Sequence, residues 1–219
     1  HIEQFNPAVE QMHKLLSDTS KICALSAHRM SAASGRITDV DVAMDLMIHD
    51  VEVILSLVKS PVVNVQASAV KTKTSPKGKD FITALLEFEN GVTADITASR
   101  ITQARVRTLS VTTDTNYIDM DFINQSINVH TQGRMPYVNQ DEIPDWMHYG
   151  LKGSVEQLFI PTNQPLQAEL NHFMNCVRGT ETPRITGEAA LEALKVIWKI
   201  EDKLGFFAQD NNLLQIAAE

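Results

Sequence analysis

The sequence has few cysteines, no long apolar run and no excess of basic residues. Its 219 residues include two cysteines, Cys23 and Cys176, whose distance along the chain fits a reducing compartment better than a disulfide scaffold. Charged residues interrupt each apolar stretch well before it reaches membrane-spanning length. The formal net charge of −8 repels phosphate backbones. We therefore expect a cytoplasmic protein with no nucleic-acid and no membrane partner.

Several catalytic signatures are also absent. The sequence has no Cys-x-x-Cys and no His-Glu-x-x-His pattern, so we predict no metal site. It has no Gly-x-Ser-x-Gly elbow, which argues against a serine hydrolase. It also lacks Gly-x-Gly-x-x-Gly and Walker A patterns, so no cradle for nucleotide phosphates is visible. Because the first residues are typical of the middle of a strand, we expect the natural chain to start earlier.

The composition supports one folded domain, with 43% hydrophobic and 21% charged residues. Hydrophobic periodicity predicts a short strand over residues 1–6, a helix over 8–17 and a strand over 21–28. The segment from Thr38 to Asp41 is typical of a capping box. It predicts a deeply packed helix that ends near residue 59, before Pro61.

The second half of the chain predicts a sheet followed by two helices. Six segments rich in Val, Ile, Thr and Phe predict antiparallel strands at 62–74, 80–89, 92–100, 105–114, 116–123 and 125–131. Asn90-Gly91 predicts a type I′ hairpin. Residues 132–163 predict a long irregular excursion, and helices are expected over 164–178 and 186–204, each followed by a glycine.

These elements predict a single α+β domain over residues 1–219, with an open, mostly antiparallel sheet and helices packed on one face. It comprises an αβ segment (1–61), a β meander (62–131), the excursion (132–163) and the closing helices (164–205). Two helices cannot cover both faces of a six-stranded sheet, and strand 92–100 alternates small with polar residues. We therefore expect the open face to bind a second copy, giving a dimer or tetramer.

The helix after residue 40 carries the residues of chemical interest, Asp45 and His49. Residues four apart on a helix share one face, where a carboxylate can orient an imidazole or bind the same substrate hydroxyl. The imidazole can accept a proton near neutral pH, as a general base must. Spacing alone favours the plainer interpretation, a hydrogen-bonded pair at the edge of the core. His49-Asp50 also resembles the dyad of metal-dependent phosphohydrolases, but no other helix supplies the further ligands.

Four motifs resemble the glucose–fructose oxidoreductase/inositol dehydrogenase family (Gfo/Idh/MocA). HIEQFNPAV resembles the segment that opens the C-terminal domain in its nucleotide-sugar members, and RITDVDVAMDLMIHDVEVIL resembles its Asp-x-x-x-His helix. EFENGVTADITASR is similar to its central hairpin, and PLQAELNHFMNCVRGTETPRITGEAALEALKVIWKI to its closing helices. The resemblance implies the C-terminal substrate and oligomerisation domain of an oxidoreductase that uses NAD or NADP. In the family, the dinucleotide and a catalytic lysine belong to an N-terminal Rossmann domain that is absent from this chain.

The resemblance also implies roles for individual residues. His49 matches the proton acceptor for a sugar or nucleotide-sugar hydroxyl, and Asp45 matches the acid that binds substrate one turn earlier. His28 and Arg29 match a substrate-binding strand, although Met30 replaces an Asn there, which argues against a cyclitol. Asn6 is either a ligand contact or a turn residue before Pro7.

This chain alone is therefore expected to bind no dinucleotide and to be inactive. The alternative is a non-catalytic assembly or ligand-binding module built on the same sheet. Intact Asp45 and His49 favour the enzyme.

Overall fold

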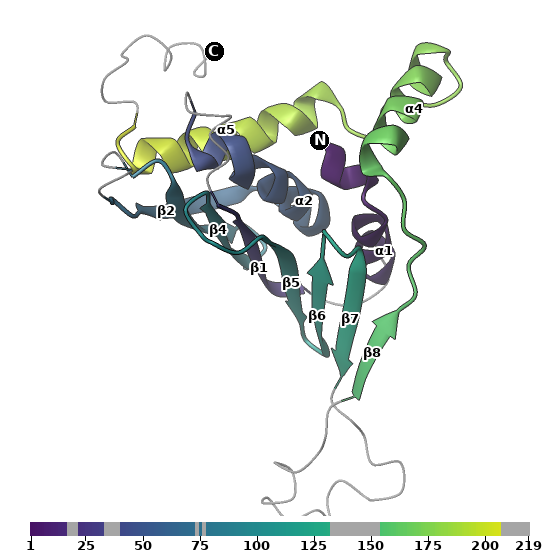
Figure 1. Cartoon of the computed structure of the whole chain (residues 1–219), viewed down its shortest axis with the longest axis horizontal. Helices are drawn as coiled ribbons and strands as arrows, with labels where there is room; N and C mark the ends of the chain where they lie inside the picture. Colours follow the sequence, from purple (N-terminus) through teal and green to yellow (C-terminus); the bar gives the residue numbers. More distant parts are fainter. Residues whose placement is uncertain (17–21, 33–39, 73–74, 76–77, 132–153, 207–219) are drawn as a thin grey trace, which may run out of the picture.

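A computed structural model describes residues 1–16, 22–32, 40–72, 75, 78–131 and 154–206 (Figure 1). Its elements, in chain order, are η1 (Ile2–Phe5), α1 (Pro7–Leu15), β1 (Ile22–Met30), η2 (Ala43–Met47), α2 (Ile48–Val58), β2 (Val62–Ala69), β3 (Phe81–Phe88), β4 (Thr93–Ser99), β5 (Val106–Thr113), β6 (Asn116–Asp121), β7 (Ser126–Thr131), β8 (Ser154–Leu158), α4 (Pro165–Val177) and α5 (Gly187–Lys203).

The described strands form an eight-stranded sheet in the order β2-β3-β4-β1-β5-β6-β7-β8. Every neighbouring pair is antiparallel except β1 with β4, where Ala24 pairs with Thr93 and Met30 with Ser99. β1 thus lies in the middle of the sheet, although it comes first in the chain. The prediction of an open, mostly antiparallel sheet is confirmed.

Two features differ from the sequence prediction at the ends of the sheet. Residues 1–6 do not form a strand, because Ile2–Phe5 is a 3-10 turn that leads directly into α1. Conversely, the excursion predicted for residues 132–163 contains β8, which pairs with β7 from Ile127–Leu158 to Thr131–Ser154. Four of the five residues of β8 are exposed, so its apolar signal was too weak to predict a strand.

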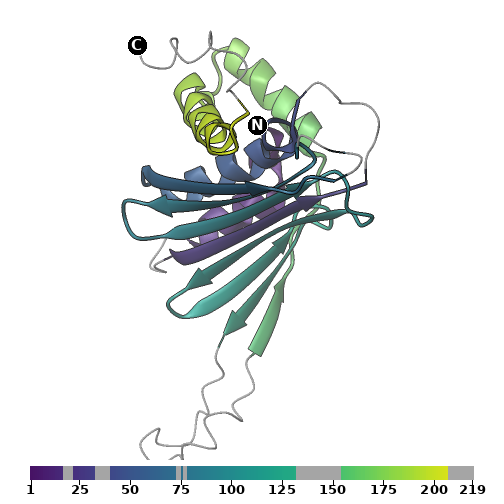
Figure 2. The same cartoon turned by 90° about the vertical axis from the view of Figure 1, so that its left-hand side faces the viewer.

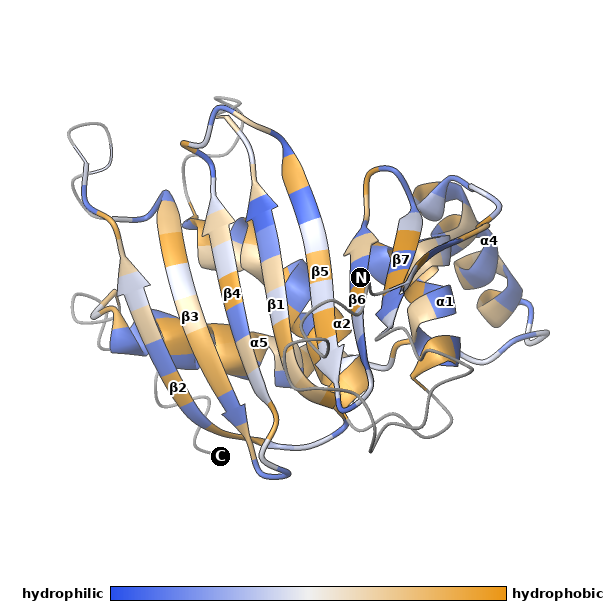
Figure 3. Cartoon of the chain, turned by 90° about the horizontal axis from the view of Figure 1, so that it is seen from below, coloured by the Kyte–Doolittle hydropathy of each residue, from blue (hydrophilic) through white to orange (hydrophobic). Residues whose placement is uncertain are grey.

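The helices lie on one face of the sheet and leave the other face open (Figure 2). Alternate residues of β4 explain this: Ala94, Ile96 and Ala98 are buried under the helix layer, whereas Asp95 and Thr97 lie on the open face. Viewed from the open side, hydrophilic and hydrophobic bands alternate along the central strands (Figure 3). The core therefore lies between the sheet and the helices, and it includes Ile54 of α2 and Ile197 of α5.

The turns and helix ends that the glycines predicted are present, but one turn is of a different type. Gly91 has φ +85° and donates to the Phe88 carbonyl, but Asn90 does not have a positive φ, so the hairpin is not the predicted type I′ turn. Gly179 (φ +73°) and Gly205 (φ +70°) follow α4 and α5, as predicted. In the described part of the chain, no helix combines the length and apolar character that crossing a membrane requires.

Candidate active site

The helix that carries Asp45 and His49 begins at Asp41. Asp41 Oδ1 accepts hydrogen bonds from the backbone N–H groups of Ala43 (2.9 Å) and Met44 (3.1 Å). Thr38, the predicted cap, lies outside the described residues. Burial, and then the nearby Asp41 carboxylate, raise the pKa of Glu201 in α5 to about 8, so that Glu201 stays protonated beside Asp41. These contacts fix the start of the helix against α5.

The first turn of this helix is irregular. Ala43–Met47 (η2) is π-helical, and regular α-helix starts only at Ile48. π-helical turns inside α-helices are rare and are frequent at functional sites. Asp45 lies within the π turn and His49 lies just after it, so the wider turn sets their relative direction.

His49 is half-buried, and its Nδ1 atom is buried without a hydrogen-bond partner among the described residues. Burial lowers the pKa of His49, and the positive charge of Arg29 lowers it further. The imidazole is therefore neutral at pH 7 and retains a nitrogen that can accept a proton. This state is the one that a general base requires.

Asp45 pairs with Arg100 rather than with His49. Its Oδ2 lies 3.8 Å from Arg100 Nη1, and its side chain is 20% exposed. Arg100 comes from the end of β4 and also contacts Asp80 through Nε (2.5 Å). Asp45 is thus within reach of a ligand, but no hydrogen bond within the described part of the chain joins it to His49.

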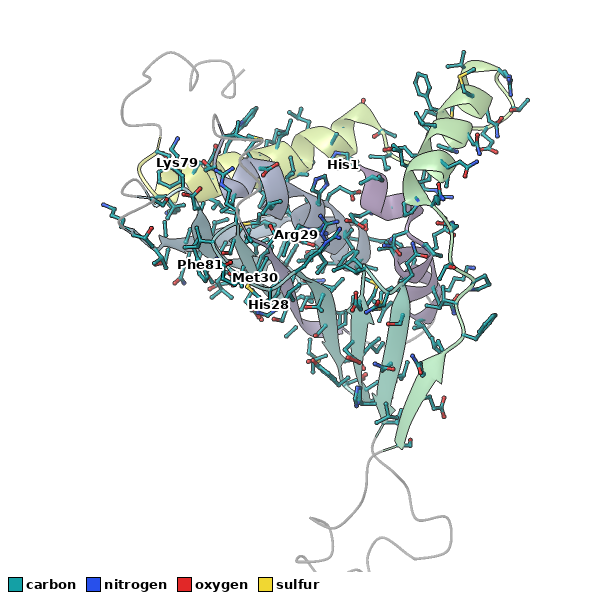
Figure 4. All side chains as sticks on the ribbon, in the orientation of Figure 1. His1, His28, Arg29, Met30, Lys79 and Phe81 are labelled. Atoms are coloured by element: carbon teal, nitrogen blue, oxygen red, sulfur yellow. The ribbon has the colours of Figure 1, made fainter. Side chains whose placement is uncertain are left out.

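Arg29 and His28 lie on opposite faces of the sheet, because successive residues of a strand alternate (Figure 4). Arg29 is buried at 2% exposure, faces α2 and donates Nε and Nη2 to the two carboxylate oxygens of Asp50, both at 2.8 Å. Its Nη1 donates to Glu3 Oε1, also at 2.8 Å. His28 lies on the open face, so these two residues cannot line one substrate site together.

Asn6 caps α1. Its Oδ1 accepts from the Ala8 N–H (3.1 Å), and its Nδ2 donates to the Phe122 carbonyl (3.0 Å). At 2% exposure the side chain has its partners within the chain. Of the two roles predicted from the sequence, these contacts favour the turn residue.

Sequence reasoning missed the buried polar residues beneath α2. Glu3 and Gln4 lie in η1, and Gln4 Nε2 donates to Glu52 Oε1 (2.9 Å) and to Ser56 Oγ (2.8 Å). Burial raises the pKa of Glu52 to about 7. The available signal was the presence of Asp50 and Glu52 in an otherwise apolar helix, since buried carboxylates require partners.

The described residues also form a hollow of about 560 Å³ between α2 and α5 and an adjoining one of about 530 Å³ between α1, α2 and the start of α5. They share Glu52, Ser56, Lys59 and Ala189, but neither includes Asp45 or His49. No group of three or more His, Cys, Asp or Glu in the described ranges could hold a metal ion. The candidate site around Asp45 and His49 therefore lies apart from these two hollows.

Comparison with known proteins shows which family part of this chain matches and which proteins the chain is similar to. The GFO/IDH/MocA C-terminal domain model matches residues 26–118. The solved structure of UDP-N-acetylglucosamine 3-dehydrogenase from Acidithiobacillus ferrooxidans superposes with a TM-score of 0.78 at 24% identity, covering 94% of this chain and 61% of that one. For aldose-aldose oxidoreductase from Caulobacter crescentus, the TM-score is 0.72 at 16% identity, over 93% and 60% of the two chains.

Residues 26–118 therefore match the Gfo/Idh/MocA C-terminal domain, and the resemblance inferred from the four motifs is confirmed. By sequence, the same Acidithiobacillus ferrooxidans enzyme is 25% identical over 209 residues, which are 95% of this chain and 62% of that protein. The chain thus spans about three fifths of the length of this curated relative.

Proposed function

We propose that this chain is the substrate-binding and catalytic part of an NAD(P)-dependent oxidoreductase that acts on a sugar or nucleotide-sugar hydroxyl. The observation that carries the proposal is His49, a neutral, half-buried imidazole at a π-to-α junction, in a domain similar to a UDP-N-acetylglucosamine 3-dehydrogenase. In the whole protein, an N-terminal Rossmann domain outside this chain would hold the nicotinamide, which would supply the acceptor for the hydride of the alcohol carbon. His49 accepts the hydroxyl proton at Nε2, and the alcohol becomes a carbonyl.

Asp45 binds a hydroxyl of the sugar in this proposal. Its side chain is 20% exposed and therefore accessible to a ligand, and the ion pair with Arg100 holds the group in place. Arg29 does not contact the substrate. It supports α2 from below through Asp50, the residue next to His49.

The experiment is to replace His49 with Ala in the complete gene product and to measure oxidation of UDP-N-acetylglucosamine with NAD⁺ and with NADP⁺. We expect kcat to fall about 10²–10⁴-fold with little change in KM, because a general base acts mainly as the transition state forms. The matched control is His13→Ala. His13 is also half-buried with a lowered pKa, but its ring is hydrogen-bonded to the Ser56 hydroxyl. Intact turnover in a soluble, folded His49→Ala protein would refute the assignment.

A second candidate function, a non-catalytic assembly module, is favoured by one observation. The open face of the sheet carries polar side chains, such as the hydrogen-bonded pair Thr83 and Thr97 (3.1 Å). A complete gene product that forms stable oligomers, binds NAD(P)H and yet oxidises no sugar or nucleotide sugar would support that alternative.

A further inference from the structure

Two buried carboxyl groups lie together where the end of α5 meets the start of η2. Asp41 is 4% and Glu201 7% exposed, and their side chains are close enough to share a hydrogen bond. Two carboxylates in such contact repel each other, so the pair holds a proton. Asp41 Oδ1 already accepts the backbone N–H groups of Ala43 and Met44, and a negative charge strengthens both bonds. The proton therefore lies on Glu201, which donates it to Asp41.

Asp41 fixes the path of the π turn. Its carbonyl accepts a hydrogen bond from the Asp45 N–H (3.0 Å), in addition to the two bonds that its side chain accepts. The next residue, Val42, donates its N–H to the Lys79 carbonyl (2.9 Å). The place of Asp41 thus sets the direction in which Asp45 leaves the helix, and Glu201 is the side chain that holds Asp41 from α5.

Few charged groups act on this pair. Among the described residues, the charges that shift the pKa of Glu201 are Asp41, which raises it, and Lys79, which lowers it less. Lys79 lies beside the end of α5 (Figure 4), with its Nζ 5.4 Å from the centre of the Phe206 ring. The other titratable residues on the elements packed against α5 are Asp45 of η2 and His49, Asp50 and Glu52 of α2, whereas β2 has none. Burial is the largest cause of the shift, and the pKa of Glu201 is raised to about 8.

We propose that Glu201 is a positioning residue for the active site: it holds Asp41 in the cap of the π turn and thereby keeps Asp45 in place to bind the sugar. The inference rests on the proposed function, which gives Asp45 that role. Loss of the proton from Glu201 places a second negative charge beside Asp41 and weakens the cap. Substrate binding should therefore weaken as the pH rises through about 8, although Glu201 itself does not touch the sugar.

The first test measures KM and kcat for UDP-N-acetylglucosamine between about pH 6 and pH 9, in the complete gene product and in its Glu201→Gln variant. Gln keeps an N–H donor toward Asp41 but has no proton to lose. We expect KM of the unaltered protein to rise about tenfold between pH 7 and pH 9, and KM of Glu201→Gln to stay constant, with similar kcat profiles. Glu201→Leu, which cannot donate, should have the raised KM already at pH 7. The matched control is Glu192→Gln on the same helix; Glu192 is exposed, and its loss should leave the pH profile unchanged.

A second measurement does not depend on activity. Hydrogen–deuterium exchange of the amides of residues 42–47 is compared between the complete gene product and Glu201→Gln at the same pH, so that the intrinsic pH dependence of exchange cancels. A carboxyl group whose pKa is higher in the folded state favours local opening as the pH rises. The ratio of the two exchange rates should therefore grow at least about tenfold between pH 5 and pH 8, whereas that of the β6 amides stays constant.

The outcomes separate this inference from the proposed function. A KM of Glu201→Gln that rises with pH as in the unaltered protein would overturn the positioning role and leave the function standing. Equal exchange of residues 42–47 in the two proteins at every pH would overturn the positioning role whether or not the protein is active. A complete gene product that oxidises no sugar, with the expected exchange ratio, would overturn the function and the role of Asp45 but not the hold of Glu201 on the π turn.

Discussion

Replacing Arg29 with Met tests whether Arg29 supports the fold or serves the substrate. The change keeps an unbranched side chain of similar length but removes the guanidinium, whose three nitrogens donate to Asp50 and Glu3 at 2.8 Å. Asp50 is 1% and Glu3 7% exposed, so two carboxylates would remain buried without their cation. Removing one partner of a buried ion pair destabilises a protein by about 3–5 kcal/mol.

We therefore expect the free energy of unfolding of chain 1–219 to fall by about 3–5 kcal/mol at pH 7, measured by urea denaturation. Arg29→Lys should lose less, because it keeps the charge but cannot bond both oxygens of Asp50. The control is Lys195→Met. It breaks the exposed ion pair with Glu192 and should change stability by no more than about 0.5 kcal/mol.

The pH dependence of the Arg29→Met variant follows from Asp50. Burial raises the pKa of Asp50 and Arg29 opposes that rise, so loss of Arg29 raises the pKa further. A carboxyl group whose pKa is higher in the folded state stabilises the fold below its unfolded pKa and loses that contribution as the pH rises. The deficit of the variant should therefore shrink between about pH 7 and pH 4. A loss below about 1 kcal/mol that does not change with pH would refute the supporting role of Arg29.

Three further predictions concern the hollow, the open face and the cofactor. Glu52 has a pKa raised to about 7, so its contribution to stability is lost as the pH rises from about 4.5 to 7. Glu52→Gln should thus gain stability relative to the unaltered chain between pH 5 and 8 in urea titrations, by up to about 3 kcal/mol; a constant difference would contradict the raised pKa. Thr97→Arg on the open face should dissociate the oligomer that sedimentation is expected to reveal, whereas Gln167→Arg on α4 should not; a strict monomer would contradict self-association. Chain 1–219 should bind neither NADH nor NADPH in calorimetry, and micromolar binding would contradict a separate dinucleotide domain.

Local sequence patterns predicted most of the elements but not their arrangement in the sheet. All six strands between residues 62 and 131 and both closing helices are present because periodicity and glycine positions are local properties. The central place of β1 depends on parallel pairing with β4, about seventy residues further along the chain, which no local pattern encodes. The 3-10 turn at Ile2–Phe5 was mistaken for a strand. The three-residue spacing of its apolar residues fits a 3-10 turn equally well.

The candidate site was predictable where spacing within one element encodes it. The Asp45 and His49 pair follows from the helical period, and the alternation of a strand could have indicated that His28 and Arg29 face opposite ways. The partners of these residues could not be predicted. Arg100 reaches Asp45 from 55 positions further along, and Arg29 reaches Asp50 from the sheet below.

The buried charges under α2 show why the sequence alone could not predict the roles of the polar residues of this helix. A carboxylate on the buried face of a helix requires a cation or hydrogen-bond donors, so Asp50 and Glu52 predict that partners exist. Only the fold brings η1 and β1 beneath α2, where Gln4 serves Glu52 and Arg29 serves Asp50. Arg29, with its charge compensated by two carboxylates, still lowers the pKa of His49. Arg29, which fixes α2 on the sheet, therefore also helps to keep the proposed base neutral, whereas its partner Glu3 acts on the pKa of His49 in the opposite direction. This shared use of Arg29 links the stability of the domain to its chemistry.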